Sequence, residues 1–263
     1  MVDIDASVNN QSALAKLLCG NIVASGGEIY EVLSYLSTSI DNVVNELNTL
    51  ESMSASQISL FAPFLGRSIL ELGCTALIAR LDPFRVLILR EYQNQMRLQR
   101  NYDTGKRNNA SISWTGDIFV AEDIKNPWSD NSLKSPTRAL LGEYYKQLIW
   151  KTNFNKLLDA TADIIEDEWI ADLRIKDFYS FYGQTSNEIK KGYSAFSKGI
   201  HHESVIPLSE DIEIIQNIKK AIRNVSTLGL FVCVISHTLN KLDIETAIAT
   251  YREIQEMGVL QWS

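Results

Sequence analysis

The most constraining feature of this sequence is a run of apolar residues at helical spacing near its start. Between Ile29 and Leu50 they recur at alternating steps of three and four, at positions 29, 33, 36, 40, 43, 47 and 50. This spacing places them on one stripe of an α-helix that packs against another helix. With a shorter helix from about 12 to 24, it predicts an N-terminal helical hairpin over residues 1–50. Because the stripe lacks a systematic charge pattern on its flanks, packing within one bundle is favoured over a dimerising coiled coil.

The remainder of the 263-residue chain also favours helices. Five prolines and thirteen glycines supply too few turns for an all-β protein. Ser56 is a plausible cap for a helix to Ala79 with Leu60 and Phe64 on its inner face, and Pro83 begins a helix to about Arg100. Further helices are predicted at about 136–173, with a break near Asn153, and at 177–183, 186–200, 209–240 and 243–257.

These elements predict a single all-α domain over residues 1–263. The bundle core is assigned to 56–100 and 136–257. Residues 101–135 are rich in Asn, Asp, Gly, Ser and Lys and lack a sustained helical period. We therefore expect one irregular surface insertion there, with a short hairpin around 111–120.

The sequence lacks the signature motifs of several enzyme classes. It has no GxxxxGK[ST] loop, no GxGxxG, no HExxH, no GxSxG and no CxxC pair, so phosphate-loop enzymes, dinucleotide enzymes, zinc proteases and serine hydrolases lose their strongest signals. No cofactor and no metal are predicted. A row of carboxylates at Asp159, Asp163 and Asp167 is interpreted as a hydrated helix face rather than a metal site.

The expected compartment is the cytoplasm, without membrane contact. Three well-separated cysteines suggest no disulfide framework, and the acidic start MVDIDAS does not resemble a secretory signal. The longest uncharged stretch, 225–240, is shorter than a membrane-spanning helix requires. It is interpreted as a buried core helix, with His237 as a core histidine.

The first candidate site is basic. Between Arg80 and Arg107 the chain carries seven basic residues against three acidic ones, although the whole protein has a net charge of −7. A surface for nucleic acid or an acidic partner is therefore a hypothesis, and a solvated charged face is the simpler alternative. The side chains proposed for this contact are Arg85, Arg90, Arg97 and Arg100.

A second candidate site is catalytic. His201 and His202 follow Lys198 at the end of a predicted helix, where an imidazole could act as a general acid or base and the lysine could hold a phosphate. Capping of the helix end by the histidines is an equal alternative. Arg67 and Glu71, four residues apart on an otherwise apolar helix, would organise the phosphate or form an ordinary salt bridge.

The segments Phe61–Gln95 and Gly192–Glu203 together resemble the helical HEPN-type proteins of bacteria, where an Arg-x-x-x-Glu helix packs near a helix ending in a Ser-Lys-x-x-His-like turn. The resemblance implies a bundle that often dimerises and works in toxin–antitoxin or antiviral defence systems. Active members cleave RNA without metal, using an Arg four to six intervening residues before a His. Here those positions are Ser, Ala, Phe, Val or Leu, which favours a binding or scaffolding member.

The leading hypothesis is thus a helical accessory or sensor component of a bacterial stress or antiviral defence system, which contacts RNA or a protein partner in a defence complex. The alternatives are a metal-independent ribonuclease using His201 or His202, and a structural subunit of a larger assembly. The sequence does not decide whether the protein is an enzyme, and it leaves a homodimer open.

Overall fold

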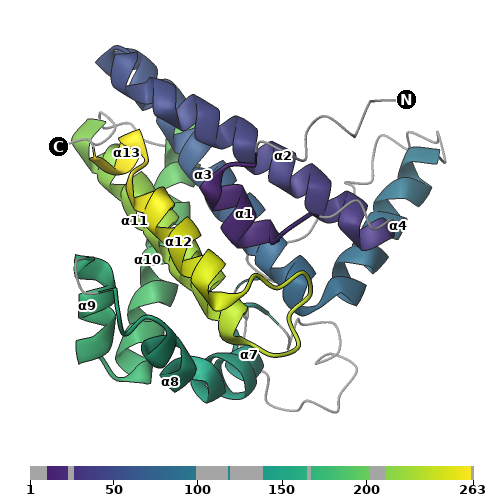
Figure 1. Ribbon diagram of the computed structural model, residues 1–263. Coiled ribbons are helices and arrows are strands. Elements are labelled where there is room, and N and C mark those ends of the chain that lie inside the picture. The colour runs from purple at the N-terminus through teal and green to yellow at the C-terminus, as the bar shows by residue number, and fades with distance from the viewer. Residues whose placement is uncertain are drawn as a thin grey trace.

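Helices dominate the computed structural model, which describes residues 11–22, 27–98, 118, 139–164, 167–201 and 211–261 (Figure 1). Within these ranges every regular element is helical, so the predicted all-α bundle is confirmed. The predicted insertion, 101–135, lies outside the described residues except for Ile118, and so does its hairpin. One hydrophobic core cluster includes buried residues from helix α1 through helix α13.

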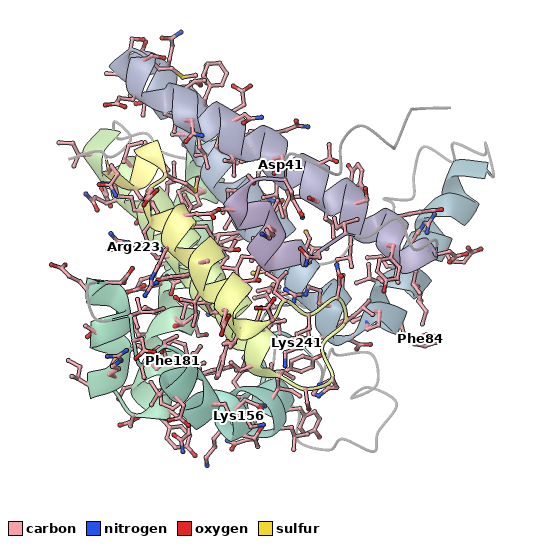
Figure 2. The ribbon with its side chains drawn as sticks, viewed as in Figure 1. Asp41, Phe84, Lys156, Phe181, Arg223 and Lys241 are labelled. Carbon is pink, nitrogen blue, oxygen red and sulfur yellow. The ribbon has the colours of Figure 1, made fainter. Side chains whose placement is uncertain are left out.

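The N-terminal hairpin consists of α1 (Ala13–Cys19) and α2 (Glu28–Thr49), followed by a short 3-10 turn, η2 (Leu50–Ser52). The apolar stripe predicted for α2 faces the core, with Val44 buried where Val43 was expected. The first helix is shorter than predicted because it ends at Gly20, whose φ is +77°. Figure 2 shows Asp41 of α2 beside α1, where its Oδ1 accepts the Ser12 backbone N–H over 2.9 Å.

The longest helix, α3 (Ala55–Leu81), packs against α2, α10 and α11. Its cap lies two residues earlier than expected, because Ser54 and Gln57 form a capping box and Ser56 lies inside the helix. Leu60 and Phe64 were predicted to face inward, but each side chain is 57% exposed, so both predictions are wrong. The next helix, α4 (Pro83–Leu98), begins at the predicted proline.

Four successive helical elements lie in the described parts of residues 139–175. These are α7 (Glu143–Tyr145), which continues through a π-helical turn, η3 (Lys146–Trp150), into α8 (Lys151–Ala160), and then α9 (Glu168–Ile175). The predicted break near Asn153 is wrong, since Asn153 is within α8 and the helix ends at Ala160. Asp159, Asp163 and Asp167 therefore do not share one helix face.

The C-terminal half contributes α10 (Phe178–His201), α11 (Asp211–Val234), α12 (Ile244–Gln255) and α13 (Gly258–Gln261). The two short helices expected at 177–200 are one continuous helix that passes through Gly183. Because α11 ends at Val234, His237 lies in the following turn and is exposed, which corrects its prediction as a core residue. Asp243 caps α12 as predicted.

The core between α8, α10 and α11 is aromatic. The ring of Phe154 packs on Phe181 at 5.5 Å and on Phe231 at 6.4 Å, while Trp150 stacks on Phe231 at 5.1 Å. Figure 2 shows Phe181 inside the bundle and Phe84 on the outside of α4. These rings fix the start of α10 against α8 and α11.

Within the described residues, one helix, α3, is long and apolar enough to cross a membrane, with a mean hydropathy of 1.3 over 18 residues. In the structure 61% of that window is buried inside the bundle. The core helix of a soluble protein meets the same criteria, so the composition of α3 does not assign a compartment.

Candidate binding surface on helices α3 and α10

Three polar side chains meet where α10 crosses the middle of α3. Arg67 donates from Nε to Glu71 Oε1 over 2.9 Å and from Nη2 to the Tyr193 hydroxyl over 2.9 Å. The same hydroxyl donates to Glu71 Oε1 over 3.3 Å, and the guanidinium carbon lies 5.0 Å from the centre of the Tyr193 ring. The predicted pairing of Arg67 with Glu71 is thus present, whereas Tyr193 was not predicted as its third member.

The cluster is partly exposed, so water weakens the electrostatic interactions between its members. The side chains of Arg67 and Glu71 are 25% and 38% exposed. Burial by itself lowers the pKa of Arg67, but the hydrogen bond and charge of Glu71 raise it above its ordinary value. Burial raises the pKa of Tyr193, so its hydroxyl stays protonated at neutral pH. Arg67 therefore stays charged and the Tyr193 hydroxyl stays protonated, as their hydrogen bonds require.

Small residues let α3 and α10 approach closely and in antiparallel directions. A Cβ placed on Gly66 would lie 2.5 Å from the Phe196 ring, and one placed on Gly199 would lie 2.8 Å from Pro63. Contacts at 66 with 196 and at 63 with 199 define the antiparallel register. The two segments that carry the family resemblance are therefore packed against each other.

The solvent side of α10 is basic. Lys190, Lys191 and Lys198 are exposed at helical spacing, with the uncharged Ser194 between them. None of the three lysines forms an ion pair with a residue that the structure describes. Glu188, on the same helix, is half-buried and accepts hydrogen bonds from Gln184 and Asn224. We call the surface formed by these three lysines the α10 face.

The predicted arginine surface on α4 is only partly described. Arg90 donates from Nη1 to the Glu28 carbonyl over 2.9 Å and pairs through Nη2 with Glu31, so it fastens α4 to the start of α2. Arg85 is half-buried. The side chain of Arg97 and the whole of Arg100 lie outside the described residues, and their role stays a prediction.

The two histidines predicted to be catalytic lie at the edge of the described residues. His201 is the last residue of α10, its side chain is not described, and His202 lies outside the described residues. Lys198 is exposed one turn before the end of α10. The contact of Gly199 with Pro63 places this last turn one turn of α3 away from Arg67.

Two lysines from η3 and α8 cluster with two tyrosines at the start of α10, and this cluster was not predicted from the sequence. The ammonium of Lys151 lies 5.0 Å from the centre of the Tyr179 ring and donates to its hydroxyl over 2.6 Å, while Lys146 lies 5.6 Å from Tyr179 and 5.5 Å from Tyr182. The π-helical turn brings residues 146 and 151 onto one side of the chain, because it joins groups five residues apart. Sequence periodicity cannot reveal such a turn.

Comparison with family models, with curated proteins and with solved structures found no match to this chain. The arrangement of the chain's own residues is therefore the basis for a proposal of its function.

Proposed function

We propose that the protein works by binding an acidic partner, nucleic acid or protein, through the α10 face, as an accessory or sensor component of a bacterial stress or antiviral defence system. The observation that carries the proposal is the row of exposed lysines 190, 191 and 198, without ion pairs to described residues, on a chain of net charge −7. Lysines in such a row are free to contact phosphates or carboxylates.

Local charge explains how an acidic protein can attract a polyanion. The field near a surface depends on the nearest charges, because salt screens those farther than about 8 Å at physiological ionic strength. In the described part of α10 the exposed charged side chains are all ammonium groups, and the neighbouring acids Glu71 and Glu188 are engaged in hydrogen bonds. The α10 face is therefore a better contact than Arg90, which is held by α2.

The proposed biological setting rests on the resemblance to HEPN-type proteins. It is supported by the packing of the Arg67–Glu71 segment against the segment that ends in Lys198 and His201, since the resemblance requires these two helices to be neighbours. The accessory role follows from the missing Arg-to-His spacing of the active nucleases.

Charge reversal tests the binding surface. A fluorescent single-stranded RNA, a DNA duplex and poly-glutamate serve as anionic probes, with fluorescence anisotropy as the readout. The variant Lys190→Glu/Lys191→Glu should bind its best probe at least about tenfold more weakly and with a shallower salt dependence. The matched control is Lys241→Glu/Arg252→Glu, which makes the same charge change at exposed positions outside α10. Equal loss in both variants, or no probe bound by the wild type, rejects the proposal.

A metal-independent ribonuclease is the second candidate. In its favour, the last turn of α10, with Lys198 and His201, lies one turn of α3 from the Arg67–Glu71–Tyr193 cluster. Such an enzyme would cleave labelled RNA in the presence of EDTA, and His201→Ala/His202→Ala would abolish cleavage. Equal cleavage by wild type and variant rejects this candidate.

A structural subunit is the third candidate, and an apolar patch on α3 favours it. Leu60, Phe61 and Phe64 are 57%, 46% and 57% exposed on one side of the helix, although most of the large apolar side chains that the structure describes are buried or half-buried. Light scattering after size exclusion would detect self-association. A monomer whose solubility is unchanged by Phe61→Ser/Phe64→Ser would reject it.

A further inference from the structure

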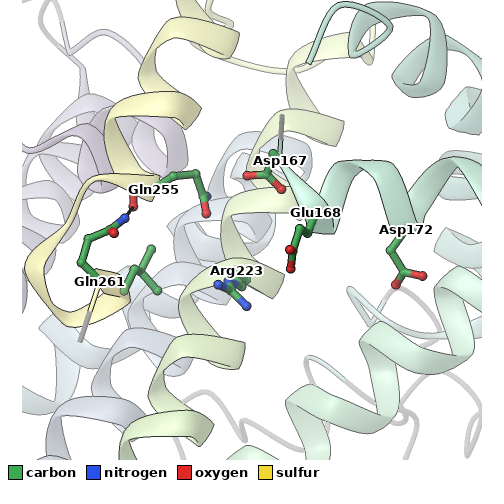
Figure 3. Close-up of a pocket in the computed structure, with 7 residues that line it drawn as sticks. Asp167, Glu168, Asp172, Arg223, Gln255 and Gln261 are labelled. Atoms are coloured by element: carbon green, nitrogen blue, oxygen red, sulfur yellow. Dashed lines mark hydrogen bonds between the residues drawn. The ribbon is translucent and has the colours of Figure 1, made fainter. Parts of the chain in front are cut away.

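A polar cavity of about 520 Å³ lies between α9, α11, α12 and α13. Figure 3 shows the carboxylates of Asp167 and Glu168 on one side, Gln255 and Gln261 on the other, and Arg223 between them. Its volume is within the roughly 300–1,000 Å³ typical of small-ligand sites. Asp172 and Leu260 complete the lining.

Two buried donors on this lining lack an acceptor in the part of the chain that the structure describes. They are Nε of Arg223 and Nε2 of Gln255. Buried N–H groups in proteins are nearly always hydrogen-bonded, so two unpaired donors in one cavity indicate where an acceptor belongs. The Nε–H of an arginine, with a neighbouring Nη–H, forms a fork that fits a carboxylate. The acceptor that best fits Arg223 is therefore a carboxylate.

The side of the cavity that carries the carboxylates would favour a cation. The lining has three carboxylates and one guanidinium. Asp167 also accepts the backbone N–H of Ile170 over 3.0 Å, and Asp172 pairs with Lys176. Glu168 is exposed, forms no such contact among the described residues, and faces Arg223 across the cavity (Figure 3). A positively charged group would be stabilised there.

We propose that this cavity binds a free basic α-amino acid. Its carboxylate would pair with Arg223 and Gln255, and a cationic group would pair with Glu168, with the negative charges of Asp167 and Asp172 nearby. A polyamine would satisfy the carboxylates but leave the two donors unpaired, and an acidic amino acid would add a second anion beside three carboxylates. The inference is independent of the proposed function, because the cavity contains none of the lysines of the α10 face.

Calorimetric titration of the full chain tests the ligand class. L-arginine and L-lysine are the probes, and putrescine and L-glutamate are the comparison ligands. We expect saturable one-to-one binding of a basic amino acid, at least about tenfold tighter than either comparison ligand. Absence of saturable binding up to millimolar arginine and lysine overturns the proposal, and so does equally tight binding of putrescine.

Two variants locate the ligand. Glu168→Gln and Arg223→Gln should each weaken binding of the basic amino acid by about tenfold. The control is Arg252→Gln, an exposed α12 residue outside the cavity lining, which should bind like the wild type. Glu168 is exposed, so its variant should fold even if Arg223→Gln does not. Wild-type affinity in Glu168→Gln overturns the assignment.

Discussion

The guanidinium of Arg80, at the end of α3, donates from Nη1 to the backbone carbonyl of Leu17 in α1 over 2.9 Å. It also donates to the carbonyls of Leu18 at 3.2 Å, Leu239 at 3.1 Å and Asn240 at 3.3 Å, and its side chain is fully buried. Carbonyls near a helix end lack helical partners and carry the negative end of the helix dipole. One cation thus ties the end of α1 and the turn after α11 to α3.

Replacing Arg80 should destabilise the protein strongly. In Arg80→Met four carbonyls lose a donor, two of them buried and two partly buried, and we expect the free energy of unfolding to fall by about 3 kcal/mol or more. Arg80→Lys keeps the charge but lacks the planar set of N–H donors, so its loss in the free energy of unfolding should be smaller than that of Arg80→Met. Urea denaturation followed by circular dichroism measures both, with the exposed Arg252→Met as control. A decrease for Arg80→Met no larger than that of the control would contradict the role of Arg80.

Arg80 also shows what sequence reasoning could not supply. Counted with its neighbours, it contributes to a basic segment, but a charge count does not distinguish a surface arginine from one that binds buried carbonyls. Its partners at Leu17 and Leu239 are 63 and 159 residues away. The fold class was predictable because helical period and caps are local, whereas Arg80 and Tyr193 acquire their roles through distant contacts.

The error at Leu60 and Phe64 has a related cause. The helix α3 is apolar on several sides because it contacts α2, α10 and α11. For such a helix, apolar spacing does not identify the side that faces water. By contrast, α2 has one clear stripe, and its buried side was predicted to within one residue.

Gly66 should not tolerate a side chain. A methyl group there would meet the Phe196 ring at 2.5 Å, so Gly66→Ala should force α3 and α10 apart and destabilise by about 1–3 kcal/mol. The second change Phe196→Leu should recover part of this loss by making room. Urea denaturation of the two single variants and the double variant measures the coupling, and strictly additive effects would contradict the close contact.

Gly183 should respond in the opposite direction. It lies inside α10, and a Cβ there would meet nothing within 4 Å. Since glycine in a helix interior is less stable than alanine, Gly183→Ala should stabilise by about 0.5–1 kcal/mol. The same denaturation assay measures this, and destabilisation would show that α10 is not continuous through this position.

Asp243 should make stability depend on pH. Its carboxylate accepts the Thr246 backbone N–H over 2.8 Å and the Thr246 hydroxyl over 2.7 Å, and these bonds hold the pKa of Asp243 below its ordinary value of 3.8. A carboxylate whose pKa is lower in the folded state stabilises the folded protein at pH values above its ordinary pKa. This stabilisation is lost as the pH falls through the folded-state pKa. The difference in melting temperature between wild type and Asp243→Asn should therefore be largest near neutral pH and shrink in acid. A constant difference would contradict the linkage.

The hydroxyl of Tyr193 should contribute modestly to the Arg67 cluster. Tyr193→Phe keeps the ring under the guanidinium but removes the group that accepts from Arg67 and donates to Glu71. Because the cluster is partly exposed, we expect a loss of no more than about 1 kcal/mol. A double-mutant cycle with Arg67→Met, measured by urea denaturation, should give a coupling energy of about 0.5–1 kcal/mol. Full additivity of the two changes would mean that the hydrogen bond between Arg67 and Tyr193 does not stabilise the contact of α3 with α10.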